Sequence, residues 1–351
     1  MKRFTMASAV LAMCAFAVFA EEEAAAPAVS ESPHAAAIAP LAAKRTLISV
    51  AWAGSKLVAV GDRGHILVSG DGKDWQQVNS PADVMLNRVR FRDEKTGFAL
   101  GHDATILATH DGGATWSAVH FDSTSRPLYD VAFVDEQHLF AIGGYGTFLD
   151  SADGGQTWTP RDFEIGALGQ HFNAVTALGD GSLLVTGEKG LLMRSTDKGA
   201  TWAMLDSPYT GSFFGVQALG PSGVVAFGLR GNIYVANDVT KCPTIKTEGY
   251  DPYSRETVKD AAKLAALGWR TVPTPTTESL FGGAHGDAGS VLVGVNGTVV
   301  KLDAGATQAT TPIPPDGDTL ADVTFRNGNW LAVGRRGARA LGTLASKTGE
   351  N

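Results

Sequence analysis

Seven short turns carry charged and aromatic side chains that could bind another molecule. Each turn has the form Gly-x-x-Gly, with Ala in the last place of one turn, and the two middle positions supply the side chains. We expect these positions to include the partner-binding residues Arg63, His102, Tyr145, Lys189, Arg230, Arg335 and Arg336. A guanidinium group presents several donors in a planar fork that suits a carboxylate. The turns therefore predict a surface that recognises acidic groups, and solvated turn charges are the open alternative.

The spacing of these turns predicts the fold that positions them. They begin at Gly61, Gly101, Gly143, Gly187, Gly228, Gly294 and Gly334, at intervals of 40, 42, 44, 41, 66 and 40 residues. Each unit contains about four short strands, as in Arg88–Arg92, Gly97–Gly101, Thr105–Thr109 and Trp116–Val119. A period near 40 with four strands per unit is typical of a β-propeller. We therefore predict an all-β, seven-bladed β-propeller over residues 46–346.

A second repeated motif, the Asp-box Ser/Thr-x-Asp-x-Gly-x-Thr-Trp, follows the third strand in four units. Its key residues are Asp71 and Trp75, Asp111 and Trp116, Asp153 and Trp158, and Asp197 and Trp202. Asp accepts local backbone N–H groups in tight turns, and Trp covers the hairpin with apolar surface. We assign these residues a structural role rather than metal binding or catalysis. The last two units lack the motif.

The blade pattern places the two kinds of turn on opposite faces. The Gly-x-x-Gly turns share a face with the connections between blades, and the Asp-box turns lie on the other face. Closure of the ring makes blades seven and one neighbours, so we expect Arg335, Arg336 and Arg63 to form one patch. We further expect residues 41–48 to supply the missing fourth strand of blade seven.

Loops that enter the inner strands add aromatic residues to the Gly-x-x-Gly face. One loop contains Phe163 and His171, and another contains Tyr209, Phe213 and Phe214. Such residues beside arginine are typical of a protein interface. We expect Phe213 and Phe214 to belong to the core instead.

The long interval predicts a helical insertion in blade five, at about residues 237–268. Asp251 can cap a helix, Pro252 fits its first turn, and Gly268 fits its end. We expect this helix to lie against the propeller rim. Cys242, within the insertion, is expected to be a buried thiol.

The two ends of the chain have compositions of their own. Residues 1–20 resemble a cleaved signal peptide, residues 21–45 an Ala-, Pro- and Glu-rich tether, and residues 347–351 a tail. The apolar run is too short to span a bilayer. The formal net charge of −7 becomes −9 once Lys2 and Arg3 are removed, which argues against nucleic-acid binding. We expect a periplasmic protein that is monomeric by itself.

The Asp-box repeats, the Gly-x-x-Gly turns and the strands Leu128–Phe133 and Leu320–Phe325 resemble the photosystem II stability and assembly factor family of seven-bladed propellers. The resemblance implies a non-enzymatic binding or assembly factor for a membrane-protein complex, with an arginine patch for its partner. Members from non-photosynthetic bacteria are commonly associated with exporters of the resistance-nodulation-division type. The acidic, Ala-rich tether and the blade-five helix depart from the photosynthetic members and argue against a photosystem partner more than against the fold.

A sialidase-like glycoside hydrolase or a glycan-binding propeller remains an alternative. Its charged groups would be Arg63, Arg230, Arg335, Tyr145, Glu188 and Asp103. The Arg-Ile-Pro stretch that introduces the first sialidase arginine is absent, and seven units exceed the six blades of a sialidase. The His and Cys spacings match no metal motif. We expect no catalytic residues, metal or cofactor.

Overall fold

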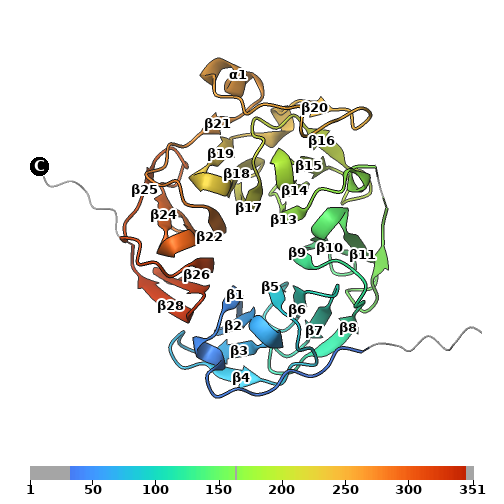
Figure 1. The fold of residues 1–351 in the computed structure, drawn as a ribbon, viewed down its shortest axis with the longest axis vertical. Coiled ribbons are helices and arrows are strands. Elements are labelled where there is room, and N and C mark those ends of the chain that lie inside the picture. The colour runs from blue at the N-terminus through green and yellow to red at the C-terminus, as the bar shows by residue number, and fades with distance from the viewer. Residues whose placement is uncertain (1–31, 163, 345–351) are drawn as a thin grey trace, which may run out of the picture. The chain divides into compact units, whose positions relative to one another are not determined.

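A computed structural model describes residues 32–162 and 164–344 of the chain. Seven antiparallel sheets in this part are arranged around a central axis (Figure 1). The innermost strand of each sheet faces the axis, and each sheet is formed by strands close in sequence. The predicted all-β, seven-bladed propeller is therefore confirmed. The predicted signal peptide, much of the tether, Phe163 and the tail fall outside the described residues.

The first four blades follow the expected order from the axis outward. Blade one consists of β1 (Leu47–Ala53), β2 (Lys56–Gly61), β3 (Ile66–Ser69) and β4 (Gln76–Val78). Blade two consists of β5 (Leu86–Phe91), β6 (Gly97–Gly101), β7 (Ile106–Thr109) and β8 (Ser117–His120). Blade three consists of β9 (Leu128–Phe133), β10 (Leu139–Gly143), β11 (Phe148–Ser151) and β12 (Thr159–Pro160). Blade four consists of β13 (Phe172–Ala177), β14 (Leu183–Gly187), β15 (Leu192–Ser195), β16 (Ala203–Leu205) and β20 (Thr244–Ile245).

The last three blades follow the same order, although the insertion precedes the outermost strand of blade five. Blade five consists of β17 (Phe213–Leu219), β18 (Gly223–Gly228), β19 (Ile233–Ala236) and β21 (Arg270–Thr271). Blade six consists of β22 (Leu280–Gly286), β23 (Gly289–Gly294), β24 (Val299–Leu302) and β25 (Ala309–Thr310). Blade seven has three described strands, β26 (Leu320–Arg326), β27 (Asn329–Gly334) and β28 (Gly337–Gly342).

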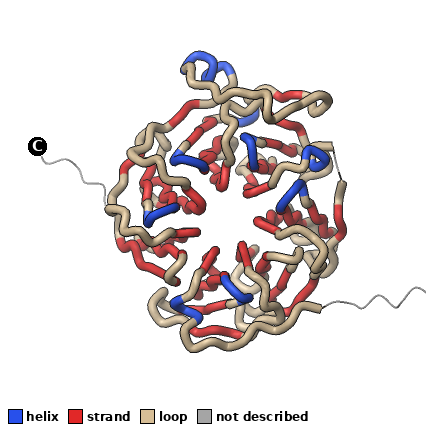
Figure 2. Tube along the Cα trace, viewed as in Figure 1, coloured by secondary structure: helices blue, strands red, loops and turns tan. Residues whose placement is uncertain are grey.

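The helices of the described chain are short, and most lie in the connections between strands. Figure 2 shows several of them as single turns close to the central axis. The 3₁₀-helices are η1 (Ala42–Lys44), η2 (Asp62–Gly64), η3 (Gly144–Gly146), η4 (Gly166–Leu168), η5 (Glu188–Gly190), η6 (Leu229–Gly231), η7 (Val239–Lys241) and η8 (Val295–Gly297). One α-helix, α1 (Ala261–Ala266), occurs in the described chain. Five of the Gly-x-x-Gly turns therefore coincide with a 3₁₀-helix, namely η2, η3, η5, η6 and η8.

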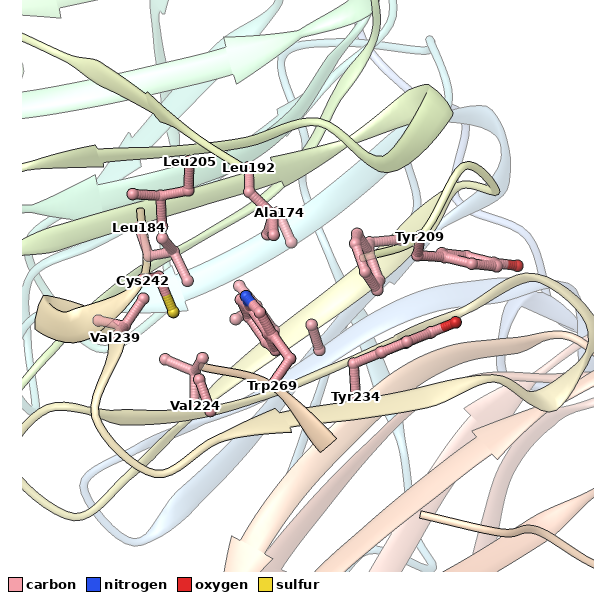
Figure 3. Close-up of a cluster of buried hydrophobic side chains, with 14 of the residues drawn as sticks. Ala174, Leu184, Leu192, Leu205, Tyr209, Val224, Tyr234, Val239, Cys242 and Trp269 are labelled. Atoms are coloured by element: carbon pink, nitrogen blue, oxygen red, sulfur yellow. The ribbon is translucent and has the colours of Figure 1, made fainter. Parts of the chain in front are cut away.

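Hydrophobic side chains fill the spaces between neighbouring blades. The largest cluster joins blades four and five and contains Leu184, Leu192, Phe213 and Tyr234 (Figure 3). Cys242 belongs to this cluster as a buried free thiol, as predicted, and burial raises its pKa to about 11. Because each sheet is covered on both faces by its neighbours, closure of the ring completes the core.

The Asp-box turns are held by their own polar side chains. In blade three, Asp153 accepts hydrogen bonds from Ser151 Oγ at 2.9 Å and Thr157 Oγ1 at 2.6 Å. The indole N–H of Trp158 donates to Gly155 O at 3.1 Å. Blade six repeats the carboxylate contacts, since Thr307 Oγ1 donates to Asp303 at 2.6 Å. The expectation that blade six lacks this turn is therefore wrong, and loss of the flanking Ser and Trp had concealed it.

The prediction that residues 41–48 supply the fourth strand of blade seven is also wrong. Residues 42–44 form η1, and Leu47 and Ile48 belong to β1 of blade one. Gly337 of β28 lies so close to η1 that an added Cβ would come within 2.0 Å of Ala43 O. The ring instead closes by side-chain packing, in which Leu57 and Leu67 of blade one meet Val333 of blade seven.

The end of the predicted tether lies against the outer edge of blade one. Ala36 N donates to Ser80 O at 3.0 Å, and Ala39 N donates to Gln77 Oε1 at 2.8 Å. Gln77 Nε2 in turn donates to Ala37 O at 3.0 Å. The described part of this segment therefore belongs to the propeller edge.

The insertion contains a shorter helix than expected. Asp260, rather than Asp251, caps α1 by accepting from Lys263 N at 2.9 Å. Asp251 instead accepts from Tyr253 N at 2.8 Å and forms a separate turn. Gly268 ends the helix in the left-handed region, as expected, with φ of 81°. The insertion also contributes β20, which pairs with β16 and extends blade four.

Candidate functional site

A pocket of about 480 Å³ lies at one end of the central channel. Its wall comes from residues close to the start of each inner strand. These residues are Ile48, Asn87, Arg88, Tyr129, Asn173, Phe214, Phe281 and Ala321. In each blade this end of the inner strand pairs with the strand that enters the Gly-x-x-Gly turn, as Leu47 pairs with Gly61. The pocket therefore opens on the face that the sequence predicted for binding.

The pocket wall is largely apolar with a polar rim. Phe214 and Phe281 lie with ring centroids 5.5 Å apart. Phe214 lines the pocket, so its expected place in the core is wrong, whereas Phe213 is fully buried as expected. Phe213 and Phe214 differ in burial because successive side chains of a strand point to opposite sides. Tyr209 is buried and donates to Leu229 O at 3.0 Å, so it packs between blades instead of forming a contact surface.

Arg88 lies at the base of the pocket and also lines a second cavity deeper in the channel. Its guanidinium is 3.4 Å from Asp130 of blade three and 3.4 Å from Asp322 of blade seven. Arg90 binds Asp130 at two points, at 2.6 and 2.7 Å. Burial by itself would raise the pKa of Asp130, but the charges of Arg90 and Arg88 outweigh it and hold that pKa below its usual value. Two arginines and two carboxylates thus form a fixed, charge-balanced floor.

Arg335 and Arg336 occupy a two-residue hairpin at the rim. Their side chains are 61 and 70% exposed, and both lie within 4 Å of the same carboxylate oxygen of Asp318, at 3.7 and 3.8 Å. Arg335 also lines the pocket. Two guanidinium groups beside one carboxylate leave positive charge available to an incoming acidic group.

The blade-one turn adjoins this hairpin through Thr46. Thr46 O accepts from Asp62 N at 3.0 Å, and Thr46 Oγ1 donates to Arg335 O at 3.5 Å. Arg63, next to Asp62, has a side chain that is 77% exposed. Since both turns contact Thr46, the structure brings the predicted blade-seven and blade-one arginines to one sector of the rim.

The other predicted site residues are spread around the face. Tyr145 lies under Arg126, whose guanidinium carbon is 4.8 Å from the ring centroid, and Lys189 lies over Tyr253 at the same distance. His102 and Arg230 are exposed, each on the turn of its own blade. The structure thus separates the seven residues into a blade-seven and blade-one group, a blade-three and blade-four group, and two single positions.

Several turn residues adopt a backbone conformation that most side chains avoid. Arg63, Tyr145, Lys189 and Arg230 have φ values of 52, 54, 54 and 58°. Left-handed backbone is uncommon for residues other than Gly, Asn and Asp, and it often occurs at binding sites. Each of these four positions has a side chain although glycine would relieve the strain.

The residues of the hydrolase alternative do not share one pocket. Of Arg63, Arg230, Arg335, Tyr145, Glu188 and Asp103, only Arg335 is among the residues that line the central pocket. In residues 32–162 and 164–344, no cluster of three or more His, Cys, Asp or Glu side chains has a metal-binding arrangement. No described helix is long and apolar enough to cross a membrane.

The fold and this pocket define a propeller with an apolar, cation-rimmed site on one face. A family model described as photosynthesis system II assembly factor YCF48 matches residues 67–126 and 116–250, which together exceed half of the 351-residue chain. The protein therefore belongs to this family, as the repeats indicated. No curated protein sequence matches the chain at a significant level.

Solved structures support the fold. The chain is similar to a structure entitled "YCF48 bound to D1 peptide", with 14% identity, TM-score 0.61 and coverage of 88% of this chain and 98% of that one. YCF48 from Cyanidioschyzon merolae gives 14% identity, TM-score 0.62 and coverage of 85 and 96%. The WD40 domain of Sif2 gives 11% identity, TM-score 0.57 and coverage of 84 and 80%.

The sequence reasoning missed most of the pocket wall. Ile48, Asn87, Asn173 and Phe281 each occupy the second position of an inner strand. That shared position is a signal visible in the aligned repeats. Its meaning depends on knowing which face of the inner strand meets the axis.

Proposed function

We propose that this protein is a non-enzymatic binding factor that captures a peptide segment of a membrane-protein partner on the Gly-x-x-Gly face. The observation that carries this proposal is the apolar central pocket with Arg335 and Arg336 at its rim. An apolar side chain of the peptide packs against the paired rings of Phe214 and Phe281, which line the pocket. A carboxylate of the same peptide pairs with the rim arginines.

Family membership supports the assembly role. The related YCF48 structure has a D1 peptide bound, and we extend peptide binding of this kind to the present chain. The signal-like composition of residues 1–20 supports a periplasmic location, and we propose an exporter of the resistance-nodulation-division type as the partner complex. The scattered positions of Arg63, Arg230, Tyr145 and Glu188 favour binding over sialidase chemistry.

Site-specific photocrosslinking in cells tests this function. A photoreactive amino acid replaces Arg336 on the proposed face, and in a matched strain it replaces Lys73, an exposed residue of the opposite face. We expect a membrane protein to be captured from position 336 and not from position 73. Arg335→Glu should reduce capture from position 336 several-fold, whereas Lys73→Glu should leave it unchanged. Equal capture from both faces, or turnover of a sialoside by the purified protein, would overturn the proposal.

A further inference from the structure

A continuous row of aromatic and cationic side chains leads from the central pocket to the outer rim of the same face. Tyr129 lines the pocket and stacks on His171, with ring centroids 6.0 Å apart and planes inclined by 15°. His171 contacts the ring of Tyr145 at 4.5 Å, and its Nε2 lies 3.9 Å from Glu188. Lys189 follows Glu188 in the turn of blade four. The row thus crosses from blade three to blade four without interruption.

The insertion extends this row beyond the propeller body. Tyr253, which is 78% exposed, lies beneath Lys189 with the ammonium nitrogen 4.8 Å from its ring centroid. Figure 1 shows the insertion outside blades four and five, where it carries α1 and β20. Through Tyr253, the insertion gives the blade-four turn an aromatic neighbour from a distant part of the chain.

Contacts with the β16–β17 connection fix the insertion in this place. Arg255 donates to Ser207 O at 2.8 Å and pairs with Asp206. Thr257 Oγ1 lies 2.7 Å from Thr210 Oγ1, and Val258 N donates to Pro208 O at 2.8 Å. Since these bonds are made by residues that closely follow Tyr253, its ring is carried on a braced segment. A prearranged surface loses less entropy when a partner binds.

The charge of the row is suited to carboxylates. Arg126 lies over Tyr145 and Lys189 over Tyr253, so each cation rests on an exposed ring. Contact with an aromatic face orients a cation and leaves its outer side open to an anion. One carboxylate lies beside the row, since Glu188 is 3.9 Å from His171 Nε2.

We propose that the row Tyr129, His171, Tyr145, Arg126, Lys189 and Tyr253, here the lateral track, binds an acidic extension of the peptide held in the central pocket. This inference rests on the proposed function and adds a determinant of specificity that the insertion supplies. The occupant is an extended peptide with acidic residues several positions from its apolar anchor. Four residues of extended chain span about 13 Å, which covers the steps of 6.0 and 4.5 Å from Tyr129 through His171 to Tyr145, the ring that Arg126 contacts.

Synthetic peptides separate the track from the pocket. The probes are fluorescein-labelled nonapeptides with a central phenylalanine and aspartates three and four residues away from it, in either chain direction. Matched peptides have a serine pair in place of the aspartates. Fluorescence anisotropy on the purified protein should give an affinity at least about 5-fold higher for one aspartate peptide than for its serine counterpart.

Variants then assign this preference to the track. Lys189→Glu should abolish the aspartate preference and leave the serine peptide bound as before, and Tyr253→Ala should reduce the preference. Lys241→Glu is the matched control, because Lys241 is an exposed lysine of the same insertion whose side chain pairs with Asp238. An aspartate preference that survives Lys189→Glu, or equal binding of aspartate and serine peptides, overturns the track while leaving the pocket proposal intact. Failure of every peptide to bind overturns both.

Discussion

Asp322 of blade seven accepts a hydrogen bond from Ser49 Oγ of blade one at 2.8 Å, across 273 residues of sequence. The same carboxylate accepts from Val50 N at 3.2 Å and lies 3.4 Å from Arg88 of blade two. Asp130 makes the equivalent link from blade three to Val175 N of blade four, at 3.1 Å. These two aspartates join adjacent inner strands where the seven sheets converge, and Asp322 does so at the seam of the ring.

Asp322→Ala should therefore weaken the closed ring. The substitution removes the acceptor for the β1 contacts and leaves Arg88 with one fewer carboxylate partner in a largely buried place. Loss of one partner of a buried charged pair costs about 3 kcal/mol or more of unfolding free energy. Chemical denaturation followed by circular dichroism measures this loss. Asp287→Ala, an exposed aspartate of the β22–β23 hairpin, is the control and should change stability by less than about 0.5 kcal/mol. Equal effects of the two substitutions would contradict the proposed seam.

The Asp-box turn of blade three should contribute acid sensitivity. Hydrogen bonds from the Thr157 side chain and backbone lower the pKa of Asp153 from 3.8 to about 2. A carboxyl with a lowered pKa in the folded state stabilises the fold above its unfolded pKa, and this contribution is lost as the pH falls toward 2. Asp153→Asn should therefore decrease, by up to one proton, the proton uptake on unfolding between about pH 4 and 2. Unfolding titrations across this range measure it, and unchanged uptake would show that the turn contacts have no such effect.

Gln77 should hold the N-terminal segment on blade one. Its amide contacts Ala39 N at 2.8 Å and Ala37 O at 3.0 Å, which are the side-chain bonds to this segment from β4. Gln77→Ala should increase amide hydrogen exchange in residues 36–45 several-fold while the blade strands keep their protection. Gln76→Ala, its exposed neighbour in β4, is the matched control and should leave exchange unchanged. Faster exchange in both variants would point to a general loosening of β4 instead.

The sequence by itself determined the number of blades, the order of the first three strands in each blade and the face on which the Gly-x-x-Gly turns lie. These features follow from local chemistry, because turn residues and alternating apolar residues repeat with a period near 40. The same local reasoning placed Phe213 in the core and predicted Cys242 to be buried. Family membership, drawn from the same repeats, is also confirmed.

Only the tertiary structure decided which of these residues meet. Phe214 and Phe281 are 67 positions apart, and Tyr253 reaches Lys189 from an insertion whose path has no repeat to predict it. The prediction for the seam between blades seven and one was also wrong. The missing fourth strand of blade seven suggested that residues 41–48 would supply it, whereas the ring closes through side-chain packing and the contacts of Asp322. Contacts of this kind depend on the relative placement of sheets, which short-range patterns do not encode. The pocket and the lateral track therefore depend on the tertiary structure.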